Sequence, residues 1–173
     1  MYARFIKLDW KKLSEAINLS LSQTLEIFSD GRLSGELLQQ IAINQFQLIP
    51  SSNCDVYDAL FPITKEKIEI RLITSYGIKT APSNQIGANR KFNKEFYLKK
   101  LEDIEYFLFL DLRTVTENLP CYLLPSSIVR KFYNKRLLSK VGSTTSNKII
   151  SLLLFESLRL PWIQNQGIPL DFL

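Results

Sequence analysis

The chain has 173 residues, of which 46% are hydrophobic and 23% are charged, and its formal net charge is +5. This composition predicts one globular domain with a sizeable core and excludes a disordered, collagen-like or repeat protein. The sequence contains no histidine, which excludes Ser-His and Cys-His catalysis, histidine zinc sites and histidine bases. Any chemistry must therefore come from carboxylates, lysine, arginine, hydroxyl groups or a metal ion held by oxygen atoms.

No apolar run reaches the roughly eighteen residues that a membrane-spanning helix needs. The longest candidate covers residues 149–160, and Glu156 and Arg159 interrupt it. The N-terminal residues lack the uninterrupted apolar core of a signal peptide. We therefore expect a soluble, cytoplasmic protein with no membrane partner, in which Cys54 and Cys121 are reduced thiols.

Two amphipathic helices are predicted in the N-terminal part of the chain. Asp9 can cap the first, and apolar residues then recur at spacings near 3.6, at Leu13, Ile17, Leu21, Leu25 and Phe28. Residues 29–32 end this helix. Ser34 can cap the second helix, which presents one apolar face made of Leu37, Leu38, Ile41, Ala42 and Phe46. A polar loop over residues 50–53 follows.

A hairpin of two strands is predicted after this loop. Residues 56–61 form a short strand, and residues 67–74 form a longer one after a turn. Alternation places the charged residues of the longer strand on one face, namely Lys67, Glu69 and Arg71. The following loop, residues 75–92, is longer than most connections, and such loops are often functional.

The remaining elements alternate between helix and strand. They are a helix from the Asn93 cap to about Lys100, strands over 104–112 and 120–125, a helix over 126–138, and a last helix over 148–158. Residues 104–112 are nearly all apolar, which is typical of a strand buried on both faces. The element order predicts an α/β fold with a central mixed β-sheet flanked by helices.

Two carboxylates in the predicted hairpin can face the same ion. Neighbouring strands lie about 5 Å apart, so Asp58 on the first strand and Glu69 on the second can point at one Mg²⁺. Arg71 and Lys67 share the face of Glu69 and can reach a phosphate or an attacking water. The alternative is an ordinary hairpin whose charged face is exposed to solvent.

The same stretch resembles the PD-(D/E)xK nuclease superfamily, which includes type II restriction endonucleases. The motifs that match are Gly35-Glu36 on a helix, Tyr57-Asp58-Ala59-Leu60 on a strand, and Ile68-Glu69-Ile70-Arg71 on the next strand. A buried strand after a short helix also fits, and so does a strand that precedes a basic helix. The resemblance covers residues 34–127 and implies a restriction-endonuclease-like fold, with residues 1–173 forming a single nuclease-like domain.

Carried over to this chain, the resemblance assigns roles to several acidic residues. Asp58 and Glu69 would hold Mg²⁺, with Asp55 as a rival to Asp58, and Glu36 would be an auxiliary acidic group. The family usually has lysine where this chain has Arg71. Arginine is always protonated and cannot act as a base. Either Arg71 neutralises the phosphate or orients water, or Lys67 takes over, or the site is inactive.

The expected activity is Mg²⁺-dependent, sequence-specific hydrolysis of double-stranded DNA by a type II restriction enzyme. Cleavage of both strands implies a homodimer or higher homo-oligomer. A homing or repair endonuclease of the same fold is one alternative. A non-catalytic DNA-binding protein with a degenerate nuclease site is another, motivated by Arg71. A structural or partner-binding α/β protein is the last.

DNA contacts are predicted in two regions. The long loop and the residues beside it offer amides for adenine edges and cations for guanine and phosphate, namely Lys79, Asn84, Gln85, Asn89, Arg90 and Lys91. From Asn118 to Phe155 there is no acidic residue, and this window includes Arg130 and Lys131. A one-signed surface attracts polyanions. The alternative is a solvated helix face without a partner.

Overall fold

The computed structural model describes residues 4–31, 35–52, 56–82, 91–114 and 117–157. In chain order the elements are β1 (Arg4–Lys7), α1 (Trp10–Ala16), α2 (Leu21–Asp30), α3 (Gly35–Gln45), β2 (Ile49–Pro50), β3 (Ala59–Leu60), β4 (Lys67–Thr74), β5 (Gly77–Lys79), α4 (Lys94–Asp103), β6 (Tyr106–Asp111), β7 (Asn118–Pro125), α5 (Ser126–Asn134), β8 (Ser143–Thr144) and α6 (Asn147–Ser157). The described part of the chain holds no helix long and apolar enough to span a membrane.

The described strands form one mixed sheet. Its order is β1-β7-β6-β4-β3-β2, with β5 pairing with both β4 and β8. The pairs are antiparallel except for β4 and β6, which run parallel with Glu69 opposite Phe107. The chain returns from β4 to β6 through α4, as a parallel pair requires a crossover connection. The predicted α/β class and the mixed sheet are therefore confirmed.

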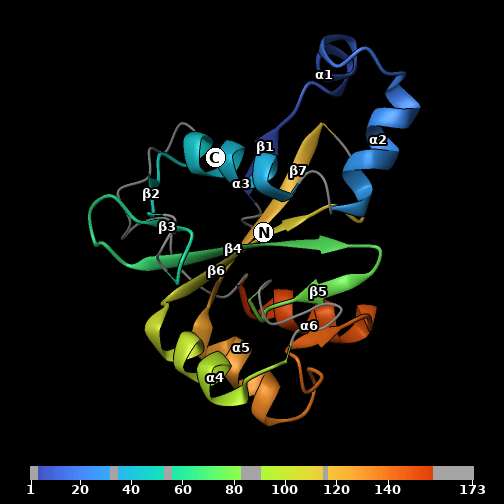
Figure 1. Ribbon diagram of the computed structural model, residues 1–173. Helices are drawn as coiled ribbons and strands as arrows, with labels where there is room; N and C mark the ends of the chain where they lie inside the picture. Colours follow the sequence, from blue (N-terminus) through green and yellow to red (C-terminus); the bar gives the residue numbers. More distant parts are fainter. Residues whose placement is uncertain (1–3, 32–34, 53–55, 83–90, 115–116, 158–173) are drawn as a thin grey trace.

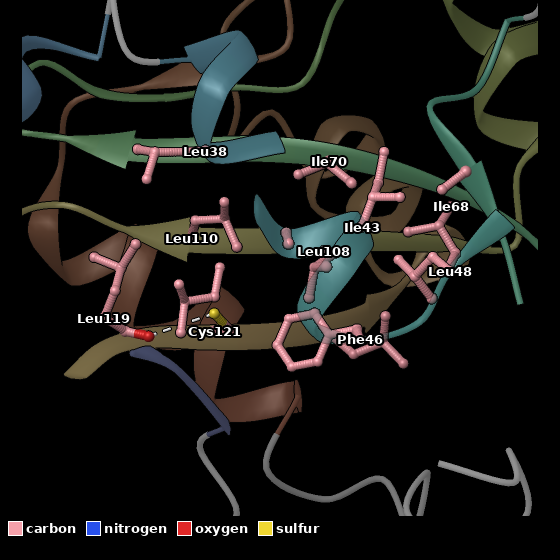
Figure 2. Close-up of a cluster of buried hydrophobic side chains, with 14 of the residues drawn as sticks. Leu38, Ile43, Phe46, Leu48, Ile68, Ile70, Leu108, Leu110, Leu119 and Cys121 are labelled. Carbon is pink, nitrogen blue, oxygen red and sulfur yellow. Dashed lines mark hydrogen bonds between the residues drawn. The ribbon is translucent and has the colours of Figure 1, made fainter. Parts of the chain in front are cut away.

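Helices cover both faces of the sheet (Figure 1). On one face α1, α2 and α3 pack on even-numbered residues of β4 and β6, such as Ile68, Ile70 and Leu108. Figure 2 shows this cluster, where the thiol of Cys121 donates to the carbonyl of Leu119 over 3.4 Å. On the other face α4, α5 and α6 pack on odd-numbered residues, including Phe107. Glu69 and Arg71 belong to this second face.

The N-terminal helix predicted as one segment is two helices. α1 ends at Ala16, and Asn18 adopts a left-handed backbone with φ of 56°, which asparagine tolerates better than most residues. Ser20 then starts α2 through a capping box with Gln23. Such a box satisfies backbone groups that a helix start leaves unpaired. The apolar spacing continues across this break, and it therefore predicted a single helix.

Short strands and one helix end also differ from the sequence predictions. The first hairpin strand shrinks to β3, and four strands were not predicted: β1, β2, β5 and β8. β5 lies inside the segment predicted as a loop, and Gly77 (φ of 92°) leaves room for the backbone of Thr144 in β8. α5 ends at Asn134, earlier than predicted. Two-residue strands carry too little alternation to be recognised before their partners are known.

Candidate functional site

Glu69 is the buried acidic residue at the centre of the candidate site. β4 carries it between Ile68 and Ile70, whose side chains enter the opposite core. Its side chain is only 1% exposed and faces α4. The interpretation of this strand face as solvent-exposed is therefore wrong for Glu69. A buried carboxylate is costly unless it is paired, so its partners decide what this residue can do.

Two cations contact the same oxygen of Glu69. The Lys100 ammonium donates to Oε1 over 2.6 Å, and the Arg71 guanidinium donates to Oε1 from the same strand. The other carboxylate oxygen, Oε2, is buried and accepts no hydrogen bond in the described structure, and Arg71 Nε likewise has no acceptor. Buried polar atoms without partners are uncommon in native proteins, and each calls for an explanation.

Asp58 lies beside this group. In β3, Ala59 pairs with Ile68, so continuing the register places Asp58 next to Glu69. The backbone N–H of Asp58 donates to the carbonyl of Ile68 over 2.9 Å, and its Oδ2 accepts from the N–H of Ile70 over 2.7 Å. Asp58 therefore continues the hydrogen bonding to β4 beyond the two-residue strand β3. It lies along an edge of β4 that β3 leaves uncovered.

Burial and the neighbouring charges shift the pKa values of Glu69 and Lys100. Burial raises the pKa of Glu69, Arg71 lowers it, and the Asp58 charge raises it further. Burial lowers the pKa of Lys100, whereas Glu69 raises it and Arg71 lowers it. Desolvation disfavours the charged form of each group. Burial therefore favours the neutral forms of Glu69 and Lys100, and the contacts of Glu69 with Lys100 and Arg71 oppose this effect.

Sequence reasoning did not single out Lys100. Its signal is its position in α4, where Tyr97, Leu101 and Ile104 form a buried stripe at helical spacing. Lys100 sits within that stripe and is 7% exposed. Lysine is almost never fully buried unless it is paired. A lysine on the apolar face of a predicted helix therefore indicates an acidic partner on the sheet beneath it.

The structure does not bring the other predicted catalytic residues to this group. Lys67 lies half-buried on β4, with its ammonium 5.7 Å from the ring centroid of Tyr57. Glu36 is exposed on α3, which packs on the face of the sheet opposite to Glu69. Asp55, the rival metal ligand, lies outside the described residues.

The predicted DNA-binding residues divide into three groups. Lys79, Lys91 and Lys131 are exposed. Arg130 forms an ion pair of 2.7 Å with Glu102 across α5 and α4. The remaining four lie outside the described residues: Asn84, Gln85, Asn89 and Arg90.

Exposed cations gather where α5 ends, and we call this region the basic end. It comprises Lys79, Lys94, Lys131, Lys135, Arg136 and Lys140. Contacts between their elements hold it together: β5 pairs with β8, the rings of Tyr97 and Tyr133 join α4 to α5, and the Tyr133 hydroxyl donates to the carbonyl of Lys140. Figure 1 shows α4 and α5 side by side below the sheet.

An acidic pocket lies at the opposite ends of α4 and α5. It has a volume of about 420 Å³, and its lining includes Glu66, Glu102, Glu105 and Arg130. Neither Asp58 nor Glu69 nor Lys100 lines it. The carboxylate pair and its two cations are therefore not part of this pocket.

The described residues offer a divalent cation two carboxylates. No group of three His, Cys, Asp or Glu side chains in the described ranges could hold a metal ion alone. Magnesium is usually bound through one or two carboxylates together with water and substrate phosphates. Asp58 and Glu69 fit that donor set, and the unpartnered Oε2 of Glu69 is a free oxygen ligand.

The comparisons add no family to this description. No protein-family model matches the chain, and a search of curated proteins found no match. The arrangement of Asp58, Glu69, Arg71 and Lys100 therefore stands on its own geometry.

Proposed function

We propose that this protein is a Mg²⁺-dependent endonuclease that cleaves double-stranded DNA at a specific sequence, as type II restriction enzymes do. The observation that carries the proposal is the convergence of two carboxylates and two cations around Glu69 of β4. Asp58 and Glu69 lie side by side, and Lys100 and Arg71 contact Glu69. Burying several charged groups in one place costs desolvation free energy. This cost favours a functional reason for keeping the group.

Asp58 and Glu69 would hold the magnesium ion through oxygens that include the unpartnered Oε2 of Glu69. A bound magnesium ion lowers the pKa of a water ligand and offsets negative charge that develops at phosphorus. The protein's part is to fix the two carboxylates. The Ile70 N–H orients Asp58, and Lys100 orients Glu69.

Lys100 supplies the lysine that the resemblance expects two residues after Glu69. It reaches Glu69 from α4 and not from β4, where Arg71 stands instead. The ammonium places a positive charge and hydrogen-bond donors beside the carboxylate pair. Arg71 has a planar guanidinium that can bind two phosphate oxygens at once. The two cations together would neutralise and orient the scissile phosphate.

The chain path and the basic end also support the proposal. Asp58 directly precedes β3 and Glu69 lies on β4, and α4 then leads to β6, the buried parallel neighbour of β4. The basic end offers the positive surface that a phosphate backbone requires. Cleavage of both strands would need two copies of the site, so we propose a homodimer.

A non-catalytic DNA-binding protein is the second candidate. The observation that favours it is the occupation of the site by the protein's own groups. Glu69 Oε1 accepts from both Lys100 and Arg71, and Asp58 Oδ2 accepts from the backbone of Ile70. Such contacts could hold a site that has lost its metal while the basic end still binds DNA.

The test is incubation of the purified protein with phage DNA, with and without Mg²⁺. We expect discrete fragments that require Mg²⁺ and disappear in Asp58→Asn and Glu69→Gln variants. Asparagine can still accept from the Ile70 N–H, so Asp58→Asn tests the charge and preserves that hydrogen bond. Glu15→Gln, at an exposed position on α1, is the control and should cleave normally.

Two other outcomes are informative. DNA binding without cleavage by the unmodified protein would favour the second candidate. Neither binding nor cleavage would contradict the nuclease proposal and leave the carboxylate pair as a structural ion-pair cluster.

A further inference from the structure

Arg71 lies between the buried carboxylate and solvent. The side chains of Glu69, Lys100 and Arg71 are 1%, 7% and 22% exposed, respectively. A ligand that arrives from solvent therefore meets the guanidinium before it meets either of the other two. Lys100 belongs to α4, which packs on this face of the sheet, whereas Arg71 is on β4 and is the most exposed of the three.

The charges of the site are balanced while Arg71 contacts Glu69. Asp58 and Glu69 contribute two negative charges, and Arg71 and Lys100 contribute two positive charges. A divalent cation added to this group would be uncompensated, and Arg71 would repel it at close range. A phosphodiester carries a negative charge. If it binds the Arg71 guanidinium, it draws that positive charge away from Glu69.

The present contact leaves Arg71 incompletely bonded. Its Nε is buried and has no acceptor, although its terminal nitrogen donates to Glu69. An unpaired buried donor costs free energy. A phosphate can accept from Nε and a terminal nitrogen of one guanidinium together. Phosphate binding therefore satisfies a donor that the Glu69 contact leaves unsatisfied.

We propose that Arg71 is a latch that keeps Mg²⁺ away from Asp58 and Glu69 until a DNA phosphate draws the guanidinium off Glu69. This inference rests on the proposed function and names how its metal site is regulated. The two ligands then bind cooperatively, and by linkage each raises the affinity for the other by the same factor. Free protein would therefore bind metal weakly.

The test measures metal binding directly and does not depend on cleavage. Mn²⁺ is titrated into the protein, and the free ion is followed by its electron paramagnetic resonance signal, with and without a short random-sequence duplex. We expect the duplex to tighten Mn²⁺ binding about 5- to 150-fold, the usual range of coupling between sites. The same titrations on Glu69→Gln subtract the ions bound by DNA alone.

Two variants separate the latch from general charge effects. Arg71→Met should bind Mn²⁺ tightly without DNA and gain little from the duplex. Lys100→Met removes an equal charge but leaves Arg71 in place, so its Mn²⁺ binding should still depend on the duplex. Thermal unfolding of each variant confirms that it is folded before the titration.

The outcomes distinguish the latch from the proposed function. Equal Mn²⁺ affinity with and without DNA, lost in Glu69→Gln, would overturn the latch and leave the metal site intact. Absence of any Glu69-dependent Mn²⁺ binding, in Arg71→Met as well, would overturn the latch together with the magnesium-dependent function.

Discussion

At the residue scale, Glu69 is the group on which the site and local stability both depend. Its carboxylate is the shared acceptor for Lys100 and Arg71. Burying these charges costs more than their attraction returns unless all of them are paired. The cluster is therefore weak evidence for stability by itself and sensitive to the loss of any one member. Removing the shared acceptor, Glu69, and removing one donor, Lys100, should therefore lower the free energy of unfolding by different amounts.

Glu69→Gln should lower the free energy of unfolding by roughly 3–5 kcal/mol, because it removes the carboxylate that both the buried Lys100 and the partly buried Arg71 contact. Lys100→Met should cost less, because Glu69 keeps its contact with Arg71. Urea denaturation of the three proteins measures both values. An unchanged midpoint in Glu69→Gln would show that the ion pairs do not form in solution.

At the element scale, α4 connects the site to the basic end. It carries Lys100 toward β4, and one turn earlier it carries Tyr97, which is fully buried. The Thr80 hydroxyl donates to the carbonyl of Gly142 over 2.7 Å, so Tyr97 donates its own proton to Thr80 over 2.5 Å. This chain of hydrogen bonds ties α4 to β5 and to the loop before β8. Lys100 lies one turn after Tyr97 on this helix.

The Tyr97 hydroxyl should make stability fall in alkaline solution. Burial raises the pKa of Tyr97 to about 12, whereas an unfolded tyrosine titrates near 10. Between these values the unfolded chain binds fewer protons than the folded chain, so stability falls as pH rises. The loss should begin near pH 10 and continue until the pH passes the folded-state pKa of about 12.

Tyr97→Phe isolates this contribution from the other groups that titrate at high pH. Urea denaturation of both proteins at about pH 9 and about pH 11.5 gives the two free energies. The unmodified protein should lose more stability than the variant over this range. Parallel losses in the two proteins would mean that the Tyr97 hydroxyl reaches solvent.

At the scale of the whole molecule, charge is distributed unevenly along α4 and α5. The basic end lies where α4 begins and α5 ends, and the acidic pocket lies where α4 ends and α5 begins. No acidic residue occurs from Asn118 to Phe155. A polyanion should therefore approach the molecule from the basic end. Arg71 follows Glu69 along β4 in the direction of β5, which belongs to that end.

Substitution of Lys131, Lys135 and Lys140 by glutamine should weaken DNA binding and reduce its salt dependence. Each lysine that contacts a phosphate should lower the slope of log affinity against log salt by about 1. Fluorescence anisotropy with a labelled duplex at several salt concentrations measures the slope. The matched control changes Lys7, Lys11 and Lys12, which are exposed on and near β1 and α1. Equal slopes in the two triple variants would place the DNA elsewhere.

The sequence by itself determined the elements with strong periodicity. The alternation over residues 67–74 predicted β4 with its bounds, and the apolar run at 104–112 predicted β6. Asp9 and Asn93 cap helices as predicted, since each accepts from a backbone N–H three residues later. The face shared by Glu69 and Arg71 also followed from the two-residue period of a strand. These features depend on neighbours in the chain and so are visible in its order.

Only the tertiary structure decided what covers that face. The parallel pairing of β4 with β6 brings α4 over Glu69, and Lys100 reaches it from thirty-one residues away. The short strands β1, β5 and β8 likewise exist only through their partners. A strand pattern shows which residues face the same way, but it does not show whether water or a helix lies above them. For this reason the face on which Glu69 lies could be predicted, whereas its burial and its second cation could not.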